Sequence, residues 1–230
     1  YKAVYAYNKS TLTLLFRVYD DRVLCEYRCL WNEERRTLKL GFNSGSCVSS
    51  IPFGFIRREI SEYEMPMAQW IEGDGFSLGT SSAFSYDYDG KQIGITLLRN
   101  ALFGDLRSAP LDTSREYTYM GQGETTGVIQ MCFDNGKHAA AALNNPPIAE
   151  ANHGGIFPPQ KSFFKCDGAY LSAVKKSERN GDTILRIVEE NGENTVAGVT
   201  IGDCKFSVPL KPFEIRTITF DGSKIHKVNM

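Results

Sequence analysis

The chain has 230 residues and a formal net charge of −1, with 42% hydrophobic and 12% aromatic residues. This length and composition fit one large β domain or two small ones with a sizeable core. Lys and Arg are scattered along the chain, which argues against a nucleic-acid-binding surface. No apolar run approaches the roughly 18 residues of a membrane-spanning helix, and no signal peptide is visible.

The six cysteines include no C-x-x-C pair. In a chain of this length, such cysteines are more often buried, reduced thiols than a disulfide framework. Together with the missing signal peptide, this pattern predicts a cytoplasmic protein. The chain starts at Tyr1 rather than at Met, which we interpret as the start of a fragment of a longer polypeptide.

The first 45 residues have the period-two alternation of β-strands. Apolar positions alternate with others in residues 12–18 and 38–42, and residues 23–31 are rich in β-branched, aromatic and cysteine side chains. Charged turns at Asp20-Asp21 and at residues 32–36 separate the three runs. Because alternation with period two is typical of half-buried strands, we predict a β meander here.

The strongest turn signal in the chain is Asp89-Gly90. Glycine adopts positive φ without steric cost, so this dipeptide suits a tight type I′ turn between two antiparallel strands. After the turn, Ile93, Ile95 and Leu97 share one face of the expected strand. The sequence therefore predicts a β-hairpin around residues 85–99.

The alternation fails between residues 99 and 120, which predicts a long excursion of the functional or interfacial kind. The only helical signal is at residues 137–143, which include four consecutive alanines. Residues 146–160 are rich in Pro and Gly and predict a connector. Beyond it, short strands and turn residues recur every 8 to 12 residues, as in a sandwich.

These patterns predict an all-β fold: a large antiparallel β-sandwich with very little helix. Residues 1–145 are expected to form the main sandwich, and residues 146–160 the Pro/Gly-rich connector. Residues 161–230 would supply strands that complete the same sandwich or form a small second β subdomain.

The sequence shows no metal site and no catalytic motif. His138, His153 and His226 are widely spaced and lack companions at zinc-ligand spacing. There is no G-x-S-x-G nucleophile elbow and no phosphate-binding glycine loop after a strand. We therefore predict no catalytic residue and no metal ligand in this chain.

Two sets of polar side chains remain as candidates for a sugar site. Glycoside hydrolysis uses paired carboxylates, and four could pair across a cleft, although the sequence alone cannot place any two of them: Glu64, Glu72, Asp87 and Glu124. The second set consists of aromatic faces and forked guanidinium donors, which suit sugar rings and hydroxyls: Tyr63, Trp70, Arg57 and Arg58. The alternative is structural, with the tryptophan in the core and the arginines paired with nearby glutamates (Glu59, Glu62 and Glu64).

Several short motifs follow one another in a specific order. They are Trp31-Asn32-Glu33 with Leu38-Lys39-Leu40; Pro52-Phe53-Gly54, Arg57-Arg58 and Met65-Pro66 with Trp70; Ser85-Tyr86-Asp87 before Gly90, with Leu97-Leu98-Arg99; and residues 171–178, residues 184–189 and Phe213-Glu214-Ile215. In this order, from about residue 12 to residue 220, they resemble the C-terminal β domain of glycoside hydrolase family 38, the α-mannosidases. Two segments depart from the family pattern, residues 79–84 without a lysine and residues 122–125 without a histidine.

The resemblance implies a supersandwich, galactose-mutarotase-like β domain of a retaining, zinc-dependent, exo-acting α-mannosidase. The family's nucleophile and zinc ligands lie in an N-terminal α/β domain outside these residues, so no cofactor is expected in this chain. The implied roles are packing on that catalytic domain and lending one edge to the pocket for an α-mannoside. Tyr63, just ahead of the Met-Pro step, is the first candidate for that edge, followed by Arg57, Arg58 and Trp70.

Two alternative functions stay open. The chain could be a freestanding carbohydrate-binding β-sandwich, or a purely structural interdomain module. Neither a nucleic-acid partner nor a membrane is expected, and homo-oligomerisation is left open.

Overall fold

The computed structural model describes residues 1–102, 112, 114–133, 136–149, 154 and 161–228, with only the backbone of His138. It is 58% strand and 4% helix, and every strand pairing described is antiparallel, which confirms the all-β sandwich prediction. The chain divides into two compact units. Unit 1 comprises Tyr1–Ser50 and Ile56–Ile148, and unit 2 comprises Ile51–Phe55 and Ala149–Met230.

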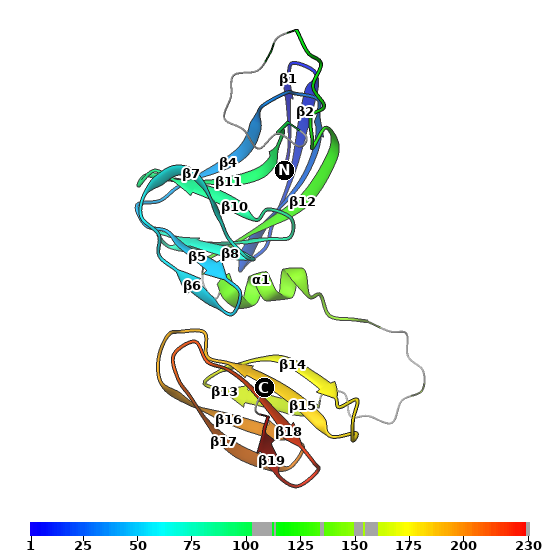
Figure 1. Ribbon diagram of the computed structural model, residues 1–230. Coiled ribbons are helices and arrows are strands. Elements are labelled where there is room, and N and C mark those ends of the chain that lie inside the picture. Colours follow the sequence, from blue (N-terminus) through cyan, green and yellow to red (C-terminus); the bar gives the residue numbers. More distant parts are fainter. Residues whose placement is uncertain (103–111, 113, 134–135, 150–153, 155–160, 229–230) are drawn as a thin grey trace. The chain divides into compact units, whose positions relative to one another are not determined.

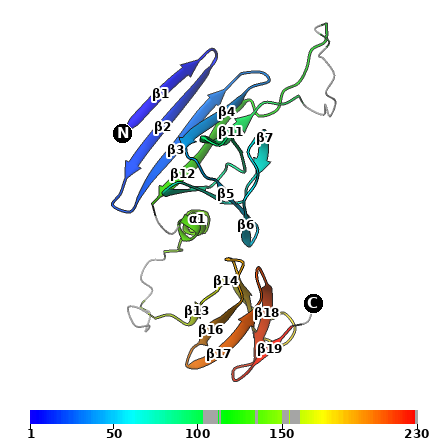
Figure 2. The same ribbon diagram turned by 90° about the vertical axis from the view of Figure 1, so that its left-hand side faces the viewer.

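Two antiparallel sheets contain the strands of unit 1 (Figure 1), and residues 51, 54 and 55 of the first sheet are counted with unit 2. The eight-stranded sheet has, in spatial order, β1 (Lys2–Tyr7), β2 (Ser10–Val18), β3 (Arg22–Trp31), β12 (Gly123–Cys132), β9 (Phe76–Thr80), β8 (Trp70–Gly73), β5 (Val48–Ile51) and β6 (Gly54–Ile56). The four-stranded sheet has β4 (Thr37–Asn43), β11 (Gln92–Arg99), β10 (Ser85–Tyr88) and β7 (Ser61–Pro66). In Figure 2 the long neighbouring arrows of β1, β2 and β3 mark the first of these sheets.

The core of unit 1 forms because alternate residues of each strand face inward. From β11, Ile93 and Ile95 are fully buried; from the eight-stranded sheet, Leu78 is fully buried, and Tyr27 and Ile129 are 2% exposed. All five belong to one apolar cluster that joins the two sheets. Full burial of a large aliphatic side chain contributes about 1.5 to 3 kcal/mol, so this cluster is the main source of stability for unit 1.

Helix α1 (Gly136–Asn144) packs on the outer face of the eight-stranded sheet, and its position confirms the helix predicted at residues 137–143. The contact is close because small residues meet there. A Cβ built on Gly79 would lie 3.0 Å from the Cα of Ala140, and Ala140 is fully buried. The Asn144 side chain then donates hydrogen bonds to the carbonyls of Thr80 and Ala140, each at 2.9 Å.

The predicted hairpin is confirmed, but the predicted turn type is wrong. Tyr88 pairs with Ile93, which makes Gly90 and Lys91 the central residues of the turn. Gly90 has φ of +87°, while Asp89 and Lys91 have no positive φ, as in a type II′ turn. The Asp89 carboxylate accepts the backbone N–H of Lys91 at 2.8 Å, and this side-chain bond fixes Asp89 ahead of the turn rather than inside it.

Unit 2 holds two further antiparallel sheets. One has β13 (Phe164–Asp167), β16 (Thr195–Ile201) and β17 (Cys204–Leu210); the other has β14 (Tyr170–Lys176), β15 (Thr183–Val188), β18 (Ile215–Phe220) and β19 (Ile225–Lys227). Leu185, Ile187, Val199 and Ile218 bring both sheets into one core. Residues 103–111 and 113 of the expected excursion, and residues 150–153 and 155–160 of the expected connector, lie outside the described residues.

Candidate functional site

Tyr63 lies in a β-bulge of the edge strand β7. Tyr86 of β10 pairs with Met65 and Tyr88 pairs with Ser61, so the three residues 62–64 stand opposite the single residue Asp87. Bulges bend an edge strand and re-aim its side chains. The Tyr63 side chain is accordingly 83% exposed, and its backbone N–H donates to Ser61 Oγ at 3.1 Å.

Arg58 is part of a partly buried hydrogen-bond network beside this strand. Its Nη1 donates to Ser49 Oγ and to the Pro66 carbonyl, both at 2.8 Å, and lies 3.2 Å from the Tyr86 hydroxyl. The Tyr86 hydroxyl donates in turn to Ser49 Oγ at 3.0 Å. Ser49 and Tyr86 are almost completely buried, so the hydrogen bonds of Arg58 connect it to the interior of the sandwich.

Trp70 is buried under helix α1 rather than in the sandwich core. Its neighbour Ile71 belongs to the core, so Trp70 faces the other side of β8. The ring is 8% exposed, and Lys137 Nζ of α1 lies 5.7 Å from its centroid. Ser50 Oγ donates to the Trp70 carbonyl at 2.7 Å and accepts its N–H at 2.9 Å, which fixes the strand at this point.

Arg58 thus bonds to Ser49 and Trp70 to Ser50, two adjacent residues of β5 whose side chains lie on opposite faces of the sheet. Arg57 is exposed on the segment before β7. Among the described residues, no hydrogen bond, ion pair or ring contact joins Tyr63 or Arg57 to the other two candidates, and neither arginine pairs with a glutamate.

A row of polar side chains crosses the outer face of the four-stranded sheet. Lys39 of β4 forms ion pairs with Glu64 of β7 and, at 2.9 Å, with Asp87 of β10. Thr96 of β11 donates its hydroxyl to Glu64 Oε2 at 2.8 Å. Each of the four strands thus contributes one member of what we call the polar row: Lys39, Thr96, Asp87 and Glu64.

The polar row brings together two of the four carboxylates named as possible partners across a cleft, Glu64 and Asp87. Desolvation raises the pKa of Glu64, but hydrogen bonds from Lys39, Thr96 and Ser85 outweigh it and hold that pKa below its usual value. A carboxylate of this kind stays ionised and bonded to its lysine at neutral pH. Sequence reasoning missed Lys39 and Thr96, although their outward positions follow from the alternation in β4 and β11; the strand pairing that joins them was the missing information.

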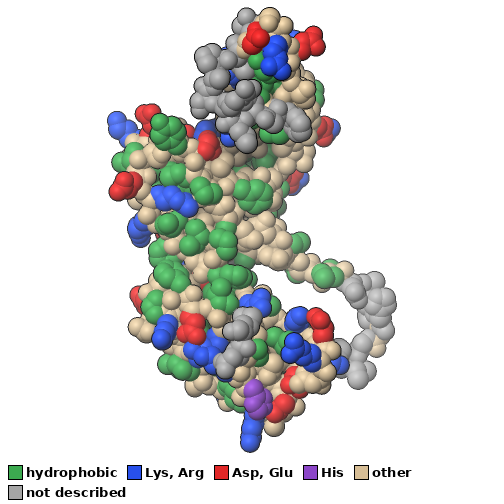
Figure 3. Space-filling model, in the orientation of Figure 1, with side chains coloured by type: hydrophobic (Ala, Val, Ile, Leu, Met, Phe, Trp, Pro, Cys, Tyr) green, Lys and Arg blue, Asp and Glu red, His purple; other side chains and the backbone are tan. Residues whose placement is uncertain are grey.

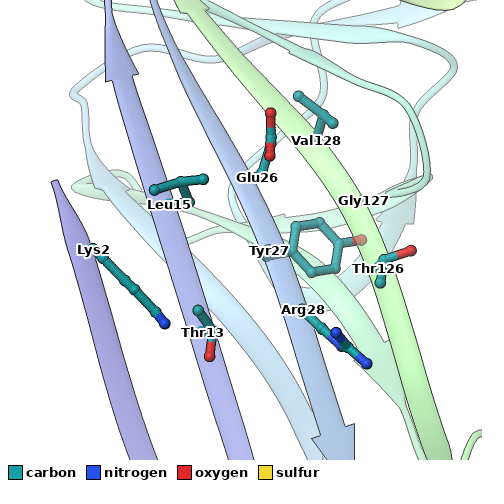
Figure 4. Close-up of a pocket in the computed structure, with 9 residues that line it drawn as sticks. All are labelled: Lys2, Thr13, Leu15, Glu26, Tyr27, Arg28, Thr126, Gly127 and Val128. Carbon is teal, nitrogen blue, oxygen red and sulfur yellow. The ribbon is translucent and has the colours of Figure 1, made fainter.

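A separate open groove of about 480 Å³ lies on the eight-stranded sheet. Figure 4 shows Lys2 on β1, Thr13 on β2, Arg28 on β3 and Thr126 on β12 around it. The Arg28 Nη2 lies 2.6 Å from an oxygen of Glu124, so the positive charge on this surface has a negative neighbour. The lining includes charged and hydroxyl side chains, but most of its exposed surface is apolar.

Gly127, which lines this groove, leaves room for the Tyr27 side chain. The Tyr27 ring extends toward Gly127 of β12, and its hydroxyl lies 2.6 Å from Ser82 Oγ (Figure 4). A Cβ at Gly127 would lie 2.5 Å from the Tyr27 hydroxyl. Burial raises the pKa of Tyr27, with the Ser82 hydrogen bond acting against it, so the phenol stays protonated.

Within the described part of the chain, no group of three or more His, Cys, Asp or Glu side chains could hold a metal ion. His226 lies 2.9 Å from the carboxylate of Asp221. His153 and the side chain of His138 are outside the description. The described residues therefore offer no donor set that fits a zinc ion.

The surface charges are also mixed. On the face shown in Figure 3, acidic and basic side chains are interspersed with hydrophobic ones.

No helix in the described residues is long and apolar enough to cross a membrane. All six cysteines are free thiols.

No protein-family model matches the chain, and no curated protein matches it. Solved structures do match it, among them two from Enterococcus faecalis. One is a protein in glycosyl hydrolase family 38, with a TM-score of 0.69 and 16% sequence identity. The other is an α-mannosidase of strain V583, with a TM-score of 0.68 and 15% sequence identity. Both matches cover 92% of this chain, but only 30% and 29% of the respective neighbours. The chain thus has the fold of a part of these larger proteins.

Proposed function

We propose that this chain is the non-catalytic β domain of an α-mannosidase of the family 38 type. In this role it packs on a catalytic domain and lends one edge to the sugar pocket. The observation that carries the proposal is the fold match over 92% of this chain to about 30% of each neighbour. The free thiols support a reducing, cytoplasmic location.

The chemistry of the reaction agrees with this division of labour. Retaining glycoside hydrolysis needs a nucleophilic carboxylate and an acid/base carboxylate about 5 Å apart. Glu64 and Asp87 are both ion-paired with Lys39 in the polar row, and the proposal assigns neither of them to the reaction. The nucleophile, the acid/base and the zinc ion of the proposed enzyme would belong to its catalytic domain. This chain would supply exposed side chains that bind and orient the sugar, with Tyr63 first and Arg57 after it, while Arg58 and the buried Trp70 would support that edge from inside the domain.

The proposal is tested by turnover of an aryl α-mannoside. The full-length polypeptide that contains the chain is expected to hydrolyse it with retention of configuration, and the chain alone to show no turnover. An aryl β-mannoside serves as the substrate control. Full-length protein that is inactive on the α-mannoside, or turnover by the chain alone, would contradict the proposal.

The groove on the eight-stranded sheet favours a second candidate, a carbohydrate-binding role without a catalytic partner. Its volume of about 480 Å³ would fit a small saccharide, whose ring face would lie on the mostly apolar lining while Thr13, Arg28 and Thr126 bind hydroxyl groups. Calorimetric titration of mannose and mannobiose into the chain distinguishes the readings. Stoichiometric binding that Arg28→Ala weakens would favour the binding module, whereas a purely structural domain shows no binding.

A further inference from the structure

We propose that the polar row is a positioning device: Glu64, Lys39 and Thr96 hold the bulge of β7 in the conformation that presents Tyr63 to the sugar. The inference rests on the proposed function for the identity of the ligand, the hydroxylated face of a mannoside. It adds three residues that act through Tyr63.

The bulge needs such support. Residues 62–64 stand opposite one residue of β10, so the ladder between Tyr86 and Tyr88 is interrupted. Strand β7 lies at the edge of its sheet and has no partner strand on its other side in the described sheet order. Without further bonds, the backbone that carries Tyr63 would sample several conformations, because an irregular edge segment has few ladder hydrogen bonds to restrain it.

The support comes from Glu64, which directly follows Tyr63. Its carboxylate is tied to Lys39 and to Thr96, which belong to β4 and β11, the two strands farthest from β7 in this sheet. Thr96 is 7% exposed, and its hydroxyl lies 2.8 Å from Glu64 Oε2. Charge-assisted bonds of this kind are stronger and more directional than neutral ones.

Gly94 of β11 leaves room for the side chains of the polar row. A Cβ at Gly94 would collide with Asp87 Oδ1 and lie 3.4 Å from Lys39 Cδ. Gly94 pairs with both Asp87 and Gly41, so the Asp87 and Lys39 side chains can lie over bare backbone. Asp87 completes the row by holding Lys39 at 2.9 Å, which orients the lysine between the two carboxylates.

A double-mutant cycle tests the proposal in the full-length polypeptide. Glu64→Gln and Thr96→Val are each combined with Tyr63→Ala, and kcat/KM is measured on an aryl α-mannoside. Misplacing a binding group by about 1 Å costs up to about 100-fold, so we expect each single variant to lower kcat/KM about 10- to 100-fold. In the Tyr63→Ala background the same substitutions should have little further effect. Glu62→Gln, on the same strand and without a described side-chain contact, is the matched control and should leave kcat/KM unchanged.

Amide hydrogen exchange of residues 61–65 provides a readout that needs no substrate. Exchange should accelerate in Glu64→Gln and Thr96→Val, but not in Glu62→Gln. Additive effects in the cycle, or unchanged exchange in both variants, would overturn the inference. If Tyr63→Ala itself leaves kcat/KM unchanged, Tyr63 has no role in the proposed function. The inference that the polar row presents Tyr63 to a sugar would then be contradicted, even if hydrogen exchange shows that the row holds the bulge.

Discussion

The carboxylate of Glu189 accepts the backbone N–H of Phe213 at 2.9 Å, although the two residues are 24 positions apart. The same carboxylate accepts the N–H groups of Asn191 and Gly192, each at 2.8 Å, and of Glu193 at 3.2 Å. Glu189 is 1% exposed. One buried anion therefore connects the turn after β15 with the turn before β18 and organises this end of unit 2.

Replacing Glu189 with alanine should destabilise unit 2, because four backbone N–H groups would lose their acceptor. Hydrogen bonds to a charged group contribute about 1.5 to 3 kcal/mol, and we expect a loss of on the order of 3 kcal/mol in the free energy of unfolding. Urea denaturation measures it. Asp203→Asn, at an exposed position of unit 2 without a described side-chain contact, is the control. A loss no larger than that of the control would remove Glu189 from this structural role.

Glu189 should also make unit 2 sensitive to acid. Desolvation opposes the effect, but the four backbone hydrogen bonds hold the folded-state pKa of Glu189 below its ordinary value. A lowered folded-state pKa contributes stability that is present above the unfolded-state pKa of about 4.3 and is lost as pH falls through the folded-state value. The melting temperature of the wild type should therefore drop between about pH 5 and pH 3 more steeply than that of Glu189→Gln. Parallel curves would show that Glu189 does not contribute to the acid sensitivity.

Gly127→Ala should disturb the contact between Tyr27 and Ser82. The new Cβ would lie 2.5 Å from the Tyr27 hydroxyl, and overpacking of this kind costs about 1 to 3 kcal/mol. Gly198→Ala is the matched control, since a Cβ there meets nothing closer than 3.9 Å. Thermal unfolding of the two variants should show a loss of stability only for Gly127→Ala; equal melting temperatures would contradict the close packing.

The thiol of Cys47 should react slowly with alkylating reagents in the native protein. Burial raises its pKa to about 11, against the opposing effects of Tyr86 and Arg58, so little thiolate exists at pH 8. Burial also raises the pKa values of Cys25 and Cys29. Mass spectrometry after iodoacetamide treatment should show these three cysteines unmodified without denaturant and fully modified in urea. Rapid native labelling of Cys47 would contradict the packing around it.

Much of the strand pattern follows from local sequence. The alternating runs at 12–18 and 38–42 correspond to β2 and β4, the run of β-branched, aromatic and cysteine residues at 23–31 corresponds to β3, and the alanine run corresponds to α1. Strands β5 and β6 were missed because they are short and lie in a segment, residues 48–56, that contains Ser, Pro and Gly. Their place at the end of the eight-stranded sheet also depends on long-range pairing. The turn type was mistaken because the Asp89 side chain, rather than residue preference, decides where the turn begins.

The candidate site was harder to predict, because it depends on which strands are neighbours. The exposure of Tyr63 comes from a bulge, and a bulge cannot be recognised without the register of β7 against β10. Lys39 and Glu64 are 25 residues apart, and no periodicity predicts that they meet. The prediction that Tyr63, Arg57, Arg58 and Trp70 contact sugar stays a prediction.

The contribution of this domain to a sugar pocket is tested most directly at Tyr63. The measurement is kcat/KM of the full-length polypeptide on an aryl α-mannoside, for the wild type and for Tyr63→Phe, alongside the melting temperature of both. At 83% exposure the side chain adds little to the core, so the melting temperature should not change. We expect kcat/KM to fall by the equivalent of about 1 to 3 kcal/mol, because the polar partner of the removed hydroxyl would be left unpaired in the closed pocket. An unchanged kcat/KM, or a fall that the melting temperature accounts for, would contradict the account.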